Sequence, residues 1–334
     1  MRTLFIGGTK RGYLTLKALL EARAKVVGVL SLSQDEHEMD RYERPIRELA
    51  QAYGVPVKEA RFVRDAALAG WAIDELKAEA GLGVGVRVLL PDWFYNAFPK
   101  GCWGVHDSLL PEYRGFAPLN WAIINDEPKT GVTVFRIAPR MDGGEILLQR
   151  DVPIGRTEPA PEVYVKVCRA TEEVVLESYE LLRTGAAAPQ PQDYAAGSFA
   201  CSRNPCDGLI EWTKPTREIF NLVRALIFPY PGAFTYYRGS RLFVLRAEEV
   251  LDAPRYVGRI PGRVVQTTSG GVDVLTGDGL LRIHEVSVDG ATTQPAAEVI
   301  RSVRAKLGLD VSELVERLAA LEGRLQDVEA HELA

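Results

Sequence analysis

The feature that most constrains the fold is an alternation of short apolar runs and amphipathic helices in the first half of the chain. Leu4–Ile6 and Lys25–Leu32 are apolar runs of strand length, and the segment 11–22 between them places its leucines on one face at helical spacing. A strand, a helix and a second strand in this order form a unit of a parallel sheet. The chain is therefore predicted to begin with an α/β domain.

The periodicity changes after a Pro- and Ala-rich segment, residues 184–192, which is typical of a linker. A short helix is predicted at residues 216–225. Five short runs separated by Gly-rich turns then indicate a small antiparallel barrel: 233–237, 242–247, 262–267, 271–275 and 280–286. A chain of 334 residues is too long for most single cores. We predict domains at residues 1–190 and 200–290, followed by a helical tail at residues 291–334.

The tail carries an apolar residue at every third or fourth position: Val311, Leu314, Leu318, Leu321, Leu325 and Val328. This spacing amounts to about three heptads, the lower limit for a coiled coil. One interpretation is an amphipathic helix that folds back on the barrel. The other, which we favour, is a short coiled coil between two subunits, so a homodimer is predicted.

Composition and charge narrow the classes of function. The net charge is −5 and no run of Lys and Arg stands out, which disfavours a nucleic-acid partner. The four cysteines lack C-x-x-C spacing, so we expect reduced thiols and no metal site. No apolar run reaches about 18 residues, the length needed to span a bilayer. These features predict a cytoplasmic protein.

One histidine has a plausible catalytic setting. His106 begins the run H-D-S-L-L-P-E-Y-R-G, and Asp142 follows in a Gly-rich turn between two apolar runs. A general base needs a group that titrates near neutral pH and a partner that orients it. His106 and Asp142 fit these roles if the fold brings their two loops together.

The same run, with the turn D-G-G-E-I-L, resembles the N10-formyltetrahydrofolate-dependent formyltransferases, a family that includes methionyl-tRNA formyltransferase and nucleotide-sugar N-formyltransferases. R-N-P-C-D-G-L-I-E-W-T-K-P, residues 203–215, resembles the C-terminal domain of that family. The resemblance covers residues 1 to about 290. It implies a Rossmann-like catalytic domain, an OB-like barrel, His106 as proton carrier, Asp142 as its orienting acid and N10-formyltetrahydrofolate as formyl donor.

The resemblance also implies two sets of binding residues. The set for the folate co-substrate comprises Arg87, Val88, Leu89, Leu90, Asp92, Arg140 and Gly143. The set for the substrate comprises Gly8, Thr9, Ser108, Arg114 and Trp121. Alternatives stay open for several of them. Gly8 and Thr9 form only a tight turn from strand to helix, and Val88 and Leu89 are an apolar strand end. Ser108 braces its loop, Arg114 bonds loop carbonyls, and Trp121 belongs to the core.

The chain departs from the family at one position. The family reads N-x-H, whereas this chain reads Gly104-Val105-His106. Loss of one amide donor of this kind costs about 100- to 1,000-fold in rate. Either a backbone N–H, a water or another side chain such as Asn96 or Asn120 replaces it, or the protein is a catalytically silent folate- or nucleotide-binding relative.

Two further segments guide the choice of substrate. P-L-N-W at 118–121 and P-Y-P-G-A-F-T-Y-Y at 229–237 resemble the nucleotide-sugar enzymes. Where the tRNA enzyme has a basic insertion, this chain has the acidic S-Q-D-E-H-E-M-D, residues 33–40. We therefore predict N-formylation of a nucleotide-linked amino sugar, with methionyl-tRNA formyltransferase as the alternative.

Overall fold

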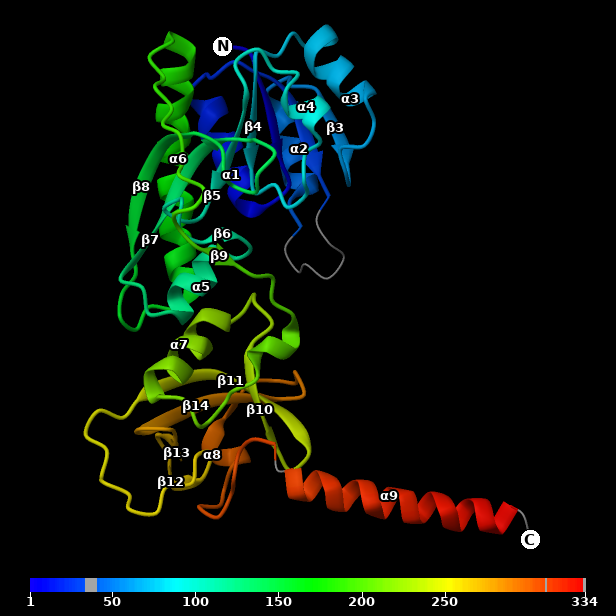
Figure 1. The fold of residues 1–334 in the computed structure, drawn as a ribbon, viewed down its shortest axis with the longest axis vertical. Helices are drawn as coiled ribbons and strands as arrows, with labels where there is room; N and C mark the ends of the chain where they lie inside the picture. Colours follow the sequence, from blue (N-terminus) through cyan, green and yellow to red (C-terminus); the bar gives the residue numbers. More distant parts are fainter. Residues whose placement is uncertain (34–40, 310, 333–334) are drawn as a thin grey trace. The chain divides into compact units, whose positions relative to one another are not determined.

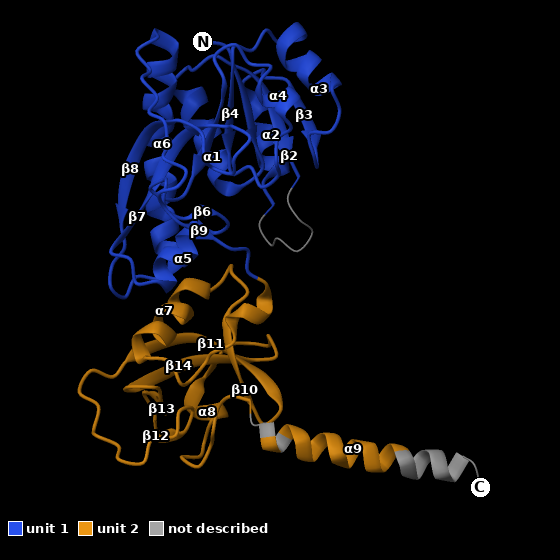
Figure 2. Ribbon diagram, in the orientation of Figure 1, with its two compact units in different colours: residues 1–203 blue, residues 204–334 orange. Residues whose placement is uncertain are grey.

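The computed structural model describes residues 1–33, 41–309 and 311–332, except the side chains of Val311, Glu313 and residues 326–332. The chain divides into two compact units, unit 1 at Met1–Arg203 and unit 2 at Asn204–Ala334 (Figure 2).

Unit 1 is built on a seven-stranded sheet with the order β3-β2-β1-β4-β5-β7-β8. The first five strands in this order are parallel, and β7 and β8 extend the sheet in antiparallel pairing. Their bounds are β1 Thr3–Gly7, β2 Val26–Leu32, β3 Val57–Ala60, β4 Ala80–Val84, β5 Cys102–His106, β7 Lys129–Arg136 and β8 Ile146–Pro153. The central strand β1 is buried along its whole length, as its apolar sequence requires.

Helices flank this sheet (Figure 1). Their bounds are α1 Lys10–Glu21, α2 Glu43–Ala52, α3 Ala67–Gly70, α4 Asp92–Tyr95, α5 Pro118–Ile124 and α6 Ala160–Thr184. Helix α1 begins after Thr9, whose hydroxyl accepts a hydrogen bond from the Gly12 N–H. Helix α6 packs against α1, β7 and β8. The predicted parallel α/β domain is confirmed.

Two strands next to the site are five residues long. Strand β4 ends at Val84, because Gly85 turns the chain with a φ of +68° that favours glycine. The strand that carries His106, β5, was not predicted. Its sequence C-W-G-V-H is too short and too mixed to stand out by periodicity alone.

Unit 2 contains a six-stranded antiparallel sheet with the order β10-β11-β14-β13-β12, and β15 pairs with β14. The bounds are β10 Ala233–Tyr237, β11 Ser240–Glu249, β12 Val264–Thr268, β13 Gly271–Leu275, β14 Leu280–Val288, β15 Gln294–Pro295, α7 Thr216–Leu226 and α8 Ala296–Val299. Helix α7 packs on β11. The predicted antiparallel second domain is confirmed. Its sheet stays open, because no pairing joins β10 to β12 in the described part of the chain.

The tail forms helix α9, Val311–Glu332. Three of its heptad leucines, Leu318, Leu321 and Leu325, are 57–60% exposed, so this part of the helix does not fold back on unit 2. The side chains of Val311 and Val328 lie outside the described part. None of the helices described is long and apolar enough to cross a bilayer.

Candidate active site

Three neighbouring parallel strands end at one edge of the sheet in unit 1. β1 ends at Gly7, β4 at Val84 and β5 at His106. Because β1, β4 and β5 are parallel, the loops that follow them meet at the same edge, where ligands of open parallel sheets bind. His106 therefore lies at the sheet edge where a bound ligand can reach its side chain.

The fold brings His106 and Asp142 together although 36 positions separate them. His106 Nδ1 lies 3.7 Å from Asp142 Oδ2, and the two side chains are 9% and 19% exposed. This distance is too long for a hydrogen bond but short enough for strong attraction between a carboxylate and an imidazolium. Asp142 is thus placed to stabilise His106 once it carries a second proton.

The other ring nitrogen of His106 is already engaged. His106 Nε2 lies 2.7 Å from the Tyr113 carbonyl oxygen, a contact in which the ring N–H donates. Tyr113 presents this carbonyl from a left-handed conformation with a φ of +56°. With Nε2 protonated, the neutral ring carries its lone pair on Nδ1, which is the atom that faces Asp142.

Several groups act on the proton affinity of His106 in opposite directions. Burial lowers its pKa from the ordinary value of 6.5 and is the largest influence. The Asp142 carboxylate and the Tyr113 carbonyl raise the pKa, and the Arg11 guanidinium lowers it. The net shift is downward, so His106 is neutral at pH 7 and able to accept a proton.

Asp142 is itself held rigidly. Its backbone adopts a left-handed φ of +47°, and its Oδ2 accepts a hydrogen bond from the Gly115 N–H at 2.8 Å. Its carbonyl accepts one from Gln192 Nε2, also at 2.8 Å. Gln192 falls in the segment 184–192 predicted as a linker. The end of that segment therefore helps to hold the Asp142 turn in place. No motif in the sequence marked Gln192 for this role.

Arg114 does not face a substrate. It is fully buried, and its guanidinium donates to the carbonyls of Asp193, Tyr194 and Ala196 and to the side chain of Gln192. Its charge also lies 4.5 Å from the centre of the Tyr194 ring. The structure therefore corrects the substrate-binding prediction and agrees with the alternative, in which Arg114 bonds loop carbonyls.

The other two candidates near the loop are also braced. Ser108 is 2% exposed and its hydroxyl donates to the Glu112 carbonyl at 2.6 Å, so it holds the loop instead of meeting a substrate. Trp121 is half-buried, and its indole N–H donates to the Cys201 carbonyl at 2.9 Å. The Arg203 guanidinium lies over the same ring.

A pocket of about 220 Å³ lies at the strand ends. Residues from both predicted sets, the folate set and the substrate set, line it. Gly8 and Thr9 after β1 line it together with Arg87 and Val88 after β4. Arg61 and Phe62 after β3 complete the wall, and neither was expected from the sequence. Gly8 is required here, because a Cβ at this position would lie 1.8 Å from the Leu32 carbonyl oxygen.

The remaining co-substrate candidates fall outside this pocket. The Leu90 side chain is 9% exposed and packs into the core of unit 1, so a contact of Leu90 with the co-substrate, predicted largely through backbone groups, stays a prediction. Leu89 is 84% exposed, and Asp92 is exposed at the start of α4. Arg140 lies over the Tyr194 ring, and a Cβ at Gly143 would meet the same ring at 2.6 Å. Arg140 and Gly143 therefore build the Asp142 turn against Tyr194.

The position of the missing amide is filled by neighbouring side chains. A Cβ at Gly104 would lie 3.1 Å from two carbons of the Phe135 ring and 3.3 Å from a methylene carbon of Ile137. The Phe135 ring also meets the His106 ring edge-on, with centroids 6.5 Å apart. An asparagine at this position therefore does not fit unless Phe135 moves. The two replacement candidates lie on other elements: Asn96 ends α4 and is exposed, and Asn120 is buried in α5.

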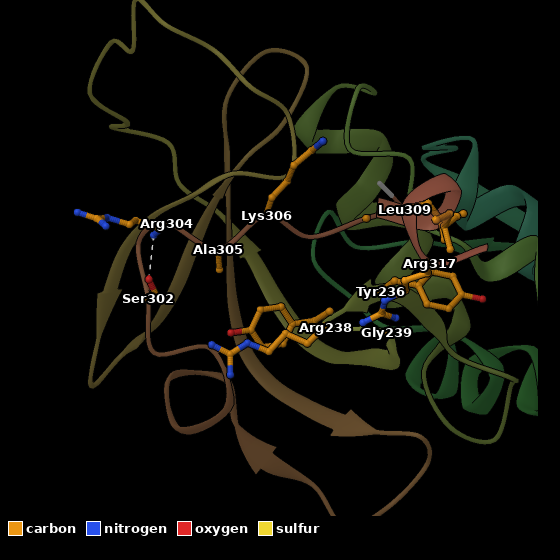
Figure 3. Close-up of a pocket in the computed structure, with 12 residues that line it drawn as sticks. Tyr236, Arg238, Gly239, Ser302, Arg304, Ala305, Lys306, Leu309 and Arg317 are labelled. Carbon is orange, nitrogen blue, oxygen red and sulfur yellow. Dashed lines mark hydrogen bonds between the residues drawn. The ribbon is translucent and has the colours of Figure 1, made fainter. Parts of the chain in front are cut away.

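Unit 2 has a larger pocket of about 590 Å³, shown in Figure 3. Four basic residues line it: Arg238, Arg304, Lys306 and Arg317. Tyr236 and Tyr237 lie among them, and no acidic residue is found among the lining residues that the structure describes. The cations come from the β10–β11 turn, the segment before α9 and α9 itself, so no basic run in the sequence announces them.

Known proteins match the chain over both units. The family described as "Formyl transferase" matches residues 1–178, and that described as "Formyl transferase, C-terminal domain" matches residues 203–304. A methionyl-tRNA formyltransferase of Roseiflexus sp. (strain RS-1) is 33% identical over 336 residues, covering 99% of each chain. One of Citrifermentans bemidjiense is 30% identical over 315 residues, covering 92% of this chain and 95% of that protein.

A solved structure shares the fold. The N-formyltransferase from Helicobacter canadensis, in complex with folinic acid and dTDP-3-aminofucose, has a TM-score of 0.64 and 17% identity. The match covers 84% of this chain and 98% of that one.

These comparisons correct two predictions. The curated relatives that match nearly the whole chain carry the name methionyl-tRNA formyltransferase, which contradicts the choice of a nucleotide-sugar substrate and the exclusion of a nucleic-acid partner. The physical reason is that net charge averages over a whole surface, whereas the unit 2 pocket gathers its cations locally. The acidic segment that supported the sugar interpretation lies, apart from Ser33, outside the described residues.

Proposed function

Since the chain belongs to the formyl transferase family and is a formyltransferase, we propose that it transfers a formyl group from N10-formyltetrahydrofolate to the amino group of methionyl-tRNA. The observation that carries the proposal is the match to a curated methionyl-tRNA formyltransferase over 99% of both chains.

His106 carries the proton in this proposal. Formyl transfer to an amine requires a group that takes a proton from the attacking nitrogen and returns one to the leaving nitrogen. Nδ1 of His106 holds the free lone pair, because Nε2–H is committed to the Tyr113 carbonyl. The imidazolium that forms is stabilised by Asp142 Oδ2, 3.7 Å away. The 3.7 Å separation also leaves an N–H of the amine room to approach both atoms.

The co-substrate supplies the formyl group, and the pocket at the strand ends fits one part of it. Its volume of about 220 Å³ suits one ring system rather than a whole drug-sized ligand. Phe62 offers an aromatic face in its wall, while Arg61 and Arg87 offer positive charge for a carboxylate. A neighbouring fold, the Helicobacter canadensis enzyme, was solved with folinic acid, which supports a folate here.

The basic pocket of unit 2 supports RNA as the carrier of the amino acid. Arg238, Arg304 and Lys306 are exposed, so they are accessible to phosphate groups of a partner. Tyr236 and Tyr237 line the same pocket and offer aromatic faces for stacking on bases. A small nucleotide-linked sugar would not need a second cationic surface on a separate unit.

The test is an assay of the purified protein with N10-formyltetrahydrofolate and methionyl-tRNA. We expect formylmethionyl-tRNA and an equal amount of released tetrahydrofolate, and no reaction with uncharged tRNA. Tetrahydrofolate release from free methionine at the same rate, or no product from methionyl-tRNA at micromolar enzyme, would show that methionyl-tRNA is not the acceptor.

A further inference from the structure

A buried ion pair lies directly beside His106 and plays no part in the mechanism above. Arg11 in α1 pairs through its guanidinium with the carboxylate of Asp107, the residue that follows His106. The two side chains are only 10% and 17% exposed. Buried ion pairs contribute little to stability on average, because desolvation offsets the attraction between the charges. This pair therefore calls for another explanation.

The position of Arg11 is also unfavourable for the helix that carries it. The first two residues of α1 are Lys10 and Arg11, and the first turn of this fully described helix contains no acidic residue. The N-terminus of a helix carries partial positive charge and favours acidic residues. A cation there is explained by Asp107, which lies against it, and not by the stability of α1.

Asp107 is fixed from two sides. Its carboxylate is held by Arg11 from α1, and its carbonyl accepts a hydrogen bond from the Thr130 hydroxyl of β7 at 3.0 Å. His106, the residue before Asp107, pairs with Thr133 of β7 in the sheet. The end of β5 is therefore clamped between a helix and a neighbouring strand.

We propose that Arg11 and Asp107 are a positioning pair for His106, which fixes the end of β5 and keeps the charge beside the imidazole balanced. This inference rests on the proposed role of His106 as proton carrier. The carboxylate that faces Nδ1 of the imidazole is that of Asp142. Arg11 and Asp107 act through the backbone and the local electric field.

The direction of the effect follows from the charges around His106. Asp142 faces it from the β7–β8 loop, Arg11 from α1, and Asp107 adjoins it in the chain. Arg11 lowers the pKa of His106, and it also acts on Cys168 of α6. Removing the Arg11 charge leaves Asp107 unpaired and raises the pKa of His106. Removing the Asp107 charge takes away a negative charge beside the Arg11 guanidinium and lowers the pKa of His106.

The experiment is an NMR titration of the His106 ring protons in the full-length protein, with H106N identifying the signal. We expect R11Q to raise and D107N to lower the His106 pKa, each by about half a unit or more. The double variant R11Q/D107N returns it to the wild-type value, and R11K leaves it unchanged. R44Q breaks an exposed ion pair of α2 and is the matched control, with no effect. Single variants that shift the pKa in the same direction, or not at all, overturn the proposal.

The double variant tests the positioning role even if a single variant does not fold, because it buries no unpaired charge. We expect its kcat to fall about tenfold with an unchanged KM, since the end of β5 is no longer clamped. A wild-type kcat would overturn this role. The titration needs no substrate, so it remains valid if the acceptor is not methionyl-tRNA. Full turnover by H106N would instead refute the proposed function of His106.

Discussion

The two units use positive charge in opposite ways. In unit 1, Arg11 is 8% exposed and Arg114 is fully buried, and each faces specific acceptors close to the Asp142 and His106 loops. In unit 2, Arg238, Arg304 and Lys306 are exposed around a pocket. A buried charge with fixed partners acts over short distances and defines geometry. An exposed charge acts over about one Debye length and attracts partners of many shapes.

The comparison indicates a division of labour. The sheet edge in unit 1 holds His106 and Asp142 in place, because the Tyr113 carbonyl bonds His106 Nε2 and Asp142 accepts hydrogen bonds from Gly115 and Gln192. The exposed cations around the unit 2 pocket attract negatively charged partners. Substitutions in unit 1 should therefore affect turnover and stability, and those in unit 2 should affect binding and its dependence on salt.

The largest effect is expected from His106→Asn. Loss of a proton carrier lowers turnover by about 100- to 10,000-fold, while affinity for the tRNA stays unchanged. His284→Asn is the matched control, because His284 lies in β14 of unit 2 and its ring also meets a carbonyl, that of Gly270, and a carboxylate, that of Glu248. Rates of formylation and filter binding measure both properties. A similar loss of turnover in the two variants would contradict the assignment of catalysis to unit 1.

The next effect concerns stability. Arg114→Met removes a buried guanidinium and leaves several carbonyls unsatisfied, so we expect a loss of about 3 kcal/mol in the unfolding free energy of unit 1. Arg238→Met, at an exposed position of unit 2, should change the unfolding free energy of unit 2 by less than about 0.5 kcal/mol. Differential scanning calorimetry compares the two. Equal transition temperatures would mean that Arg114 does not hold its loop as the contacts imply.

A smaller effect is expected where the family's asparagine is missing. Gly104→Asn places a side chain against Phe135 and should destabilise unit 1 by about 1–3 kcal/mol through overpacking. Phe135→Ala in the same chain provides space and should recover part of that loss. Gly258→Asn is the control, since a Cβ at Gly258 meets nothing within 4 Å. A Gly104→Asn protein as stable as wild type would show that the ring yields easily.

The smallest effect is expected in unit 2. R238Q/R304Q should weaken tRNA binding about tenfold at physiological salt and reduce the slope of log affinity against log salt by about one to two. At saturating tRNA the turnover should equal that of the wild type. R44Q, an exposed change in unit 1, is the control and should leave the slope unchanged. An unaltered salt slope in the double variant would remove the unit 2 pocket from RNA recognition.

Much of the architecture follows from local sequence patterns. The strand β2 and the helix α7 were predicted within a few residues, because periodicity along the chain reflects which faces are buried. The strand β5 was missed, since five mixed residues give no clear period. The histidine motif at His106 and the acid at Asp142 were both recognised from their runs of neighbours.

The sequence by itself determined the order of an α/β unit and an antiparallel unit, the family, and the two candidate catalytic side chains, His106 and Asp142, because each of these is written in contiguous residues. Only the tertiary structure decided that Arg114 is buried, that Gln192 holds Asp142, that Arg11 pairs with Asp107, and that four scattered cations share one pocket. These are contacts between residues far apart in the chain, and net charge or periodicity averages over them.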